Sequence, residues 1–325
     1  MMADPVITTI EIILIIPVAL ILGVLFLFLF RKLNARFQWR VGPVIRMYSD
    51  LAPLIGKTRI WQPLYDILKL FGKDTIITDV AHRRLFMYSP YFSLLFAIAA
   101  AFFIPFPGME LLSSVPYSLV IASYLIISSI LFTILGPVAS GSPWGAIGAR
   151  REVELFLVSE LSFVLSIFSI ALSSGTLVIS EIADRGWSAP SILLSLTSGL
   201  LLFVAMLGKL HIKPFDMPEA EAEIVAGPYT EYSGKLLGIY FLSKTFLTYV
   251  LVALFIALIL PPVSTSIFWL PAWAVAATAL VFLLTVVQVL NPRYRINNAL
   301  YWYVKVVIPV GLVSFIIAFF IRVVV

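Results

Sequence analysis

The segment from Pro214 to Tyr232 gathers several carboxylates in a chain that has few of them. The whole chain of 325 residues contains only 17 acidic residues, yet the segment reads PFDMPEAEAEIVAGPYTEY and holds Asp216, Glu219, Glu221, Glu223 and Glu231. Like charges that meet at a site of low dielectric raise one another's pKa values and titrate together. Such a group could bind and release protons near neutral pH. The alternative is a solvated acidic loop that offsets neighbouring lysines.

The conformation of this segment decides which carboxylates meet. Pro214 and Pro218 prevent a regular helix through the first residues, and Gly227 with the following proline interrupts the chain again. Between these breaks, three glutamates are spaced by two residues. In an extended conformation all three would share one face, whereas a helix would bring together only Glu219 and Glu223. Either conformation predicts several carboxylates close together.

Further ionisable residues lie within apolar stretches. Glu160 stands in the run FLVSELSFVL, and Lys244 lies inside another apolar segment. A charged side chain at the centre of a bilayer costs at least about 2.5 kcal/mol, so each of these two residues needs a partner or water. Glu11 lies near one end of an apolar segment, where snorkelling explains it. We therefore predict a proton path that comprises Glu154, Glu160, Asp216, Glu219, Glu221, Glu223, Glu231 and Lys244.

The composition indicates the elements that must position these groups. The chain is 61% hydrophobic and 12% charged, which excludes an ordinary soluble protein. A helix that spans a bilayer needs about 20 apolar residues, and eight segments qualify: 6–30, 85–104, 116–138, 153–172, 190–210, 236–260, 268–290 and 300–325. We therefore predict an all-α integral membrane protein with eight transmembrane helices in a single polytopic domain, residues 1–325.

The basic residues alternate sharply between successive loops. Nineteen of the 22 lysines and arginines fall in or beside four loops, at about 31–84, 139–152, 211–235 and 291–299. The positive-inside rule predicts that these loops are cytoplasmic and that both termini lie outside the cell membrane. Within the first loop, residues 60–71 carry apolar side chains at helical spacing, which predicts an amphipathic helix in the membrane interface.

Several cofactors and partners are excluded by residue counts. The chain has no cysteine, so disulfides and cysteine-ligated iron–sulfur clusters are absent from it. Its two histidines, His82 and His211, are expected in polar loops, which argues against a bis-histidine haem within the bilayer. We predict no metal site. Binding of nucleic acid is not expected either, because the basic loop lies against a membrane and contains no recognition module.

Several motifs together resemble the family of the complex I H subunit, the membrane subunit of its quinone module. They are QWRVGP at 38–43, QPLYDILK at 62–69, Arg151 with Glu160 eight residues beyond it, PFDMPEAEAEIVAGPYTEYSG at 214–234 and PRYRINNALYWYVK at 292–305. They follow the family's order and span most of the chain. Departures from the family pattern occur at Leu155, Ile212, Asn297 and Asn298, in the region that would face quinone. These departures favour the related complexes that couple ferredoxin oxidation to hydrogen or sulfur chemistry without a quinone.

The resemblance implies a membrane coupling subunit of a complex I-like redox complex that translocates protons or sodium ions. Its partners would be the lipid bilayer, antiporter-like membrane subunits and a hydrophilic redox arm that carries the iron–sulfur clusters and any catalytic metal. Residues expected to hold that arm are Arg36, Arg40, Arg46, Asp66, Lys69, Arg150, Arg151, Arg293 and Arg295. Three alternatives stay open: a quinone-binding subunit of an NADH- or deazaflavin-dependent oxidoreductase, a scaffold within the complex, and a stand-alone secondary transporter. The last would show inverted repeats, and the two halves show no self-similarity.

Overall fold

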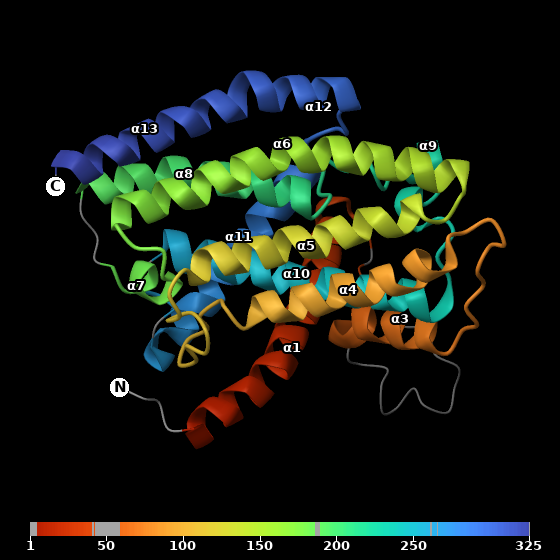
Figure 1. The fold of residues 1–325 in the computed structure, drawn as a ribbon, viewed down its shortest axis with the longest axis horizontal. Helices are drawn as coiled ribbons and strands as arrows, with labels where there is room; N and C mark the ends of the chain where they lie inside the picture. The colour runs from red at the N-terminus through yellow and green to blue at the C-terminus, as the bar shows by residue number, and fades with distance from the viewer. Residues whose placement is uncertain are drawn as a thin grey trace.

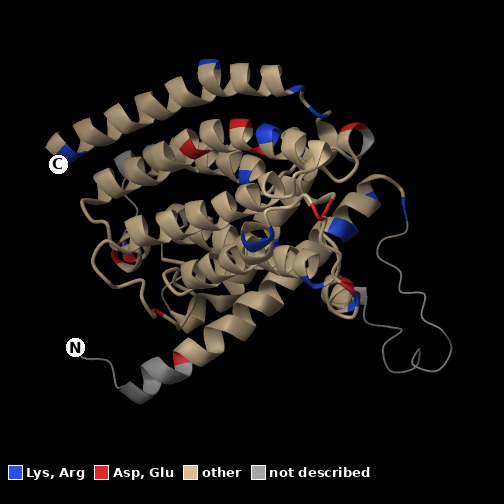
Figure 2. Ribbon diagram, turned by 45° about the vertical axis from the view of Figure 1, so that its right-hand side comes forward, with Lys and Arg blue, Asp and Glu red and all other residues tan. Residues whose placement is uncertain are grey.

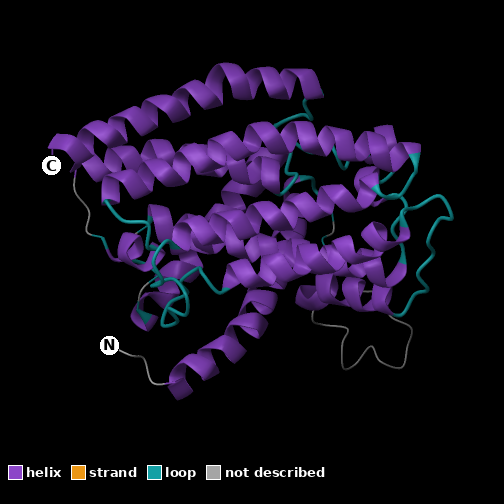
Figure 3. Ribbon diagram, in the orientation of Figure 1, coloured by secondary structure: helices purple, strands orange, loops and turns teal. Residues whose placement is uncertain are grey.

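The computed structural model describes residues 5–40, 42, 59–185, 189–260, 262–264 and 266–324, and within these it is helical with no named strand. The helices are α1 (Pro5–Phe37), η1 (Arg59–Trp61), α3 (Gln62–Phe71), α4 (Arg83–Ala101), α5 (Ser118–Val138), α6 (Pro143–Ser174), α7 (Ile179–Asp184), α8 (Ala189–Lys209), α9 (Glu221–Ile224), η2 (Gly227–Tyr229), α10 (Gly234–Ile259), η3 (Ile267–Trp269), α11 (Leu270–Leu290), α12 (Ile296–Trp302), the π-helical η4 (Tyr303–Val307) and α13 (Ile308–Val324). Figure 3 shows this all-helical architecture.

The long helices form a bundle around α10, most of which is buried. Helix α4 packs on α5 and α10, α6 packs on α8 and α13, and α1 crosses the bundle obliquely to contact α10 and α11 (Figure 1). Among the described residues, seven helices are long and apolar enough to span a membrane. Helix α8 has 21 residues, but its apolar part from Leu194 to Lys209 is shorter. The prediction of an all-α membrane protein is confirmed, and the eighth span stays a prediction.

Glycines allow the closest helix contacts in the bundle. A Cβ on Gly23 of α1 would collide with the backbone of Thr245 on α10, and one on Gly136 of α5 would collide with the hydroxyl of Tyr240. A Cβ on Gly208 would lie 2.9 Å from Cβ of Ser159. Small residues at crossings let membrane helices approach one another and bury their polar groups against neighbours. These crossings therefore set the positions of α6, α8 and α10, which carry the buried ionisable residues.

Backbone contacts group the loops at two opposite ends of the bundle. At one end, His82 N donates to Ala139 O (2.8 Å), and Tyr294 N donates to Pro214 O (3.0 Å). At the other end, Leu119 N donates to Leu177 O (3.1 Å), and both described termini lie there as well (Figure 1). Figure 2 shows most lysines and arginines toward the first end, which we call the charged end. The four loops predicted to share one side therefore meet.

Two predicted boundaries were wrong. Helix α6 begins at Pro143 instead of near Val153, because proline is favoured in the first turn of a helix and no second proline interrupts the residues that follow it. Most of the predicted loop 139–152 is therefore helical. Helix α1 continues to Phe37, seven residues beyond the predicted end. The predicted amphipathic helix exists as α3, which buries Ile67 inward and leaves Leu68 exposed; its place in the membrane interface stays a prediction.

Candidate ion path

The acidic segment connects α8 to α10 at the charged end, and only four of its residues form the short helix α9. Glu219 precedes this helix and Glu223 lies within it, so their side chains diverge. Gly227 supports the sharp turn that follows: it has a φ of +54°, and a Cβ there would collide with Pro218 O. Because α6 packs against this turn at Gly148, the segment is held against the bundle.

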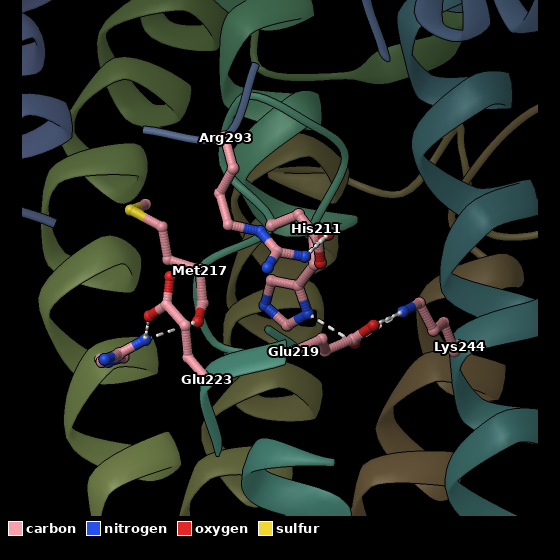
Figure 4. A network of polar contacts seen from close by, with 8 residues as sticks. His211, Met217, Glu219, Glu223, Lys244 and Arg293 are labelled. Atoms are coloured by element: carbon pink, nitrogen blue, oxygen red, sulfur yellow. Dashed lines mark hydrogen bonds and ion pairs between the residues drawn. The ribbon is translucent and has the colours of Figure 1, made fainter. Parts of the chain in front are cut away.

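Glu219 is the centre of a partly buried ionic network (Figure 4). Its carboxylate accepts hydrogen bonds from Lys244 Nζ at 2.7 and 3.0 Å, and its Oε1 lies 2.9 Å from His211 Nδ1. His211 lies in the turn that follows α8, as the sequence predicted, but its side chain is only 8% exposed. Lys244, predicted to need a partner inside the bundle, obtains it from the acidic segment.

The expected cluster of like charges is therefore replaced by pairs of opposite charge. Asp216 accepts a 2.6 Å hydrogen bond from Arg293, and Glu223 accepts one of 2.6 Å from Arg151. Glu231 is partly buried and forms no ion pair with another described residue, and the side chain of Glu221 lies outside the described residues. A neighbouring cation favours the charged form of an acid, which opposes the predicted rise in the pKa values of these carboxyl groups.

The pKa values of the segment follow from burial and from these partners. Burial opposes the charge on Glu219, but Lys244 and His211 more than offset it and lower the pKa of Glu219 well below its usual range. Burial would lower the pKa of His211, but the hydrogen bond and charge of Glu219 together with Glu152 raise it. For Asp216, burial outweighs Arg293 and raises the pKa. The raised pKa of Asp216 agrees with the predicted direction, whereas the lowered pKa of Glu219 is opposite to it.

These shifts predict the pH dependence of stability. The raised pKa of His211 stabilises the fold below its unfolded value of 6.5, and that contribution is lost as the pH rises through the folded pKa. The lowered pKa of Glu219 stabilises the fold above 4.5, and that contribution is lost as the pH falls through the folded pKa. Thermal unfolding of the purified protein should therefore occur at the highest temperature between these two values.

His211→Gln should remove the part of the fall in melting temperature that occurs on the alkaline side. His82→Gln, at an exposed site, serves as the control. Melting temperatures measured across the range from acidic to alkaline pH check this result. An alkaline decline that is unchanged in His211→Gln would show that another group causes it.

A second carboxylate, Glu152 on α6, lies beside this network. It is 1% exposed, and neither of its oxygens has a hydrogen-bond partner among the described residues. Its closest cation is His211, with Nε2 3.7 Å from Oε1 of Glu152. The sequence did not single out Glu152, because the apolar pattern places this residue in a loop. The sequence feature that could have identified Glu152 was Pro143. A helix that starts at this proline places Glu152 well inside α6.

Glu160 is paired with Lys209 rather than with Lys244. Lys209 Nζ donates to Oε2 of Glu160, and the side chain of Lys209 is completely buried. The ammonium group also lies 4.3 Å from the ring centre of Phe163, a distance at which a cation is attracted to the ring face. The charge pattern assigns Lys209 to a basic loop. The position of Lys209 at the end of an apolar segment was the sequence feature that could have indicated a buried side chain.

One small cavity links these groups. Its volume is about 20 Å³, and its lining includes Glu152, Lys209, His211, Ser243 and Lys244. The order Glu219, His211, Glu152, cavity, Lys209, Glu160 thus runs from the acidic segment into the bundle. Glu154, also predicted for the path, is different: it pairs with Arg150 at 3.1 Å on a more exposed part of α6. It is not joined to this series.

A larger cavity of about 1050 Å³ lies outside Glu219, between α1, α10, α11 and the acidic segment. Seven of its 13 lining residues are ionisable, so its surface favours water and ions. Among the described residues, no group of three or more histidine, aspartate or glutamate side chains could hold a metal ion. The arrangement can therefore bind and transfer protons between a polar vestibule and the interior of the bundle.

The residues predicted to hold a redox arm divide into two groups. Arg151, Arg293, Arg150 and Asp66 form ion pairs within the chain, the last with Arg31 at 2.6 Å. Exposed members at the charged end that form no ion pair with another described residue are Arg36, Arg40, Lys69 and Arg295. Arg46 lies outside the described residues. The second group is the one available to a partner.

The fold and the buried network define a multi-pass α-helical membrane protein whose ionisable groups extend from one end of the bundle into its interior. A family model described as NADH dehydrogenase matches residues 10–319. The chain belongs to this family, which is that of the complex I H subunit.

Two curated relatives cover most of the chain. The H subunit of the NADH-quinone oxidoreductase of Rhodospirillum centenum is 28% identical over 87% of this chain and 84% of its own length. NADH-ubiquinone oxidoreductase chain 1 of Cyanidium caldarium is 29% identical over 91% of this chain and 86% of its own length. The resemblance suggested by the motifs is confirmed.

A solved structure shares the fold. A chain in the structure of the membrane-bound sulfane sulfur reductase, described as an archaeal respiratory membrane complex, superposes with a TM-score of 0.81. The match covers 96% of this chain and 99% of that chain at 24% sequence identity. At this identity the likeness shows the fold alone.

Proposed function

We propose that this chain is the coupling subunit of a complex I-like redox complex, in which electron transfer in a docked hydrophilic arm drives proton or sodium translocation. The observation that carries the proposal is the series of buried ionisable groups from Glu219 to Glu160. A chain that served only as a scaffold or a lipid anchor would have no need to bury Glu152 without a hydrogen-bond partner among the described residues, because such burial is costly.

The mechanism uses the ion pairs of the acidic segment as a switch. A redox change in the arm would move this segment or alter the charge next to it. Glu219 would then exchange Lys244 for a proton, and His211 would release or accept a proton toward Glu152. Because the two groups titrate as a coupled pair, a small displacement of the segment changes the proton affinity of both. Antiporter-like membrane subunits would use the resulting charge shift.

The redox chemistry belongs to partners in this proposal. The chain contains no cysteine, so iron–sulfur clusters and any catalytic metal would be carried by the hydrophilic subunits. We favour a ferredoxin-linked hydrogenase or sulfur reductase relative. Supporting this choice are the departures at Leu155, Ile212, Asn297 and Asn298 from the quinone-linked pattern.

A quinone-binding subunit is the second candidate, supported by the names of the curated relatives and by the cavity of about 1050 Å³. That volume is ample for a quinone, but sites for apolar ligands are lined mainly by apolar side chains. Here the lining is largely ionisable, so a quinone ring would displace water from charged groups. This poor match to a quinone supports the first candidate, a coupling subunit of a complex that has no quinone.

Docking of the arm gives the direct test. Arg40→Glu combined with Arg295→Glu should release the hydrophilic subunits from the purified complex, because an exposed arginine commonly binds a partner carboxylate through two hydrogen bonds. Arg322→Glu, which changes an exposed arginine at the other end of the bundle, is the control. Subunit composition after affinity purification is the measurement. An arm that stays bound and active in the double variant would disprove this docking surface.

The orientation in the membrane is proposed from the charge asymmetry, with the charged end in the cytoplasm and both termini outside. Asn297→Cys at the charged end and Ile267→Cys at the other end provide exposed positions. In intact cells an impermeant thiol reagent should label only Ile267→Cys. Labelling of Asn297→Cys under the same conditions would reverse the proposed orientation.

A further inference from the structure

A group of four hydroxyl side chains joins three helices within the bundle. Ser93 of α4 lies 2.8 Å from Ser243 of α10 and 3.1 Å from Thr133 of α5, measured between side-chain oxygens. Ser129 Oγ lies 3.4 Å from Ser93 Oγ. The three serines are at most 3% exposed, and Thr133 is partly exposed on α5. We call this group the hydroxyl cluster.

The hydroxyl cluster borders the cavity that contains Glu152. Ser243 and Thr133 line this cavity together with Glu152 and Lys209. A cavity needs about 10–15 Å³ and two to four polar partners to hold a water molecule, and this one offers about 20 Å³. A single water there would supply the hydrogen bonds that both oxygens of Glu152 lack among the described residues.

We propose that Glu152, one water and the hydroxyl cluster form a proton relay that leads from the buried network to the α5 surface at Thr133. This inference rests on the proposed function and assigns the next part of its path. Glu152 gives its proton to the water, which passes one to Ser243 Oγ. Each hydroxyl then releases its own proton to the next oxygen as it accepts one. Every O–H bond formed is matched by one broken, and no net charge remains on the serines.

The same geometry selects protons over sodium ions on this route. The cavity is lined by Lys209 and Lys244, and Glu152 is the carboxylate residue in its lining, so a metal cation would find few anionic ligands there. It has room for about one water, whereas a metal cation without its water shell needs several oxygen ligands around it. A proton needs only a continuous series of hydrogen bonds.

Hydroxyl groups between membrane helices also serve as packing contacts, so the test must separate the two roles. In the purified complex reconstituted into vesicles, Ser93→Ala and Ser243→Ala should each lower the rate of proton uptake at least about tenfold while the complex stays assembled. Ser166→Ala is the matched control, because this buried serine also bonds across helices, to Ser198 O at 2.6 Å. Ser243→Thr, which keeps a hydroxyl at this position, should leave the rate of proton uptake close to that of the unmodified complex.

The outcomes distinguish a proton relay from a cluster that serves only in packing. Normal proton uptake in Ser93→Ala and Ser243→Ala would overturn the relay, and loss of assembly together with normal uptake by the remaining complex would assign the cluster to packing. If neither alanine variant assembles, Thr133→Val decides, because it removes a partly exposed hydroxyl with almost no change in shape. Glu152→Gln separates this inference from the proposed function: if it stops uptake while the hydroxyl variants do not, only the relay fails.

Discussion

Replacing Glu152 with glutamine should stop ion translocation while leaving the complex assembled. Glutamine keeps the size of the side chain and most of its hydrogen-bonding capacity but cannot carry an exchangeable proton. A positioned proton-transfer group commonly contributes about 10²–10⁴-fold in rate, so we expect ion uptake into vesicles to fall at least about 100-fold. Electron transfer should slow as well if the two processes are tightly coupled.

The control for this experiment is Glu181→Gln, which changes an exposed glutamate of α7 at the opposite end of the bundle. Ion uptake and electron transfer should be measured in the same vesicles, with and without an ionophore. An assembled Glu152→Gln complex that pumps at the normal rate would eliminate the buried carboxylate series as the path. The acidic segment would then be best explained as a docking surface.

Replacing Glu160 with glutamine should instead reduce the amount of folded protein. Lys209 is completely buried and Glu160 is its ionic partner, so the substitution leaves an unpaired ammonium group in the bundle. Removing one partner of a buried pair costs about 3–5 kcal/mol. The yield of intact complex and its melting temperature are the measurements, and both should fall.

The double variant Glu160→Gln with Lys209→Met distinguishes this structural role from a role in proton transfer. Methionine fills the space of the lysine stem without its charge, so the double variant should regain stability that the single variant lost. If it also pumps, Glu160 and Lys209 form a structural pair outside the path. Unchanged stability of Glu160→Gln alone would show that Lys209 finds another partner or loses its proton.

Much of this architecture could be predicted because it depends on local sequence. Long apolar segments specify spans, and alternating charge places the loops at two ends, where the backbone contacts indeed group them. Pairings such as Lys244 with Glu219 could not be predicted in the same way. They depend on which side chains of α10 and the acidic segment face each other, and the periodicity of α10 carries no such information because the helix is apolar on all sides.

His211 and Lys209 show a second limit. Both lie next to basic or proline-containing sequence, which favours a surface loop, yet the chain turns inward between α8 and the acidic segment. His211 has a φ of +53°, an uncommon conformation for a residue with a side chain. Tertiary contacts set turns of this kind. Here His211 contacts Glu152, which lies on α6, and Glu219, which belongs to the acidic segment.

The order of two ion pairs along the chain has a consequence for the biogenesis of the protein. A lysine inserted alone at the centre of a membrane helix costs about 3 kcal/mol. Lys244 lies inside α10 and Lys209 ends α8, and their acidic partners Glu219 and Glu160 both precede them in the chain. When either lysine leaves the ribosome, the glutamate that neutralises it has already been synthesised. The glutamate is therefore available to pair with the lysine during insertion. The order of residues along the chain thus allows each charge to enter the lipid with its partner rather than before it.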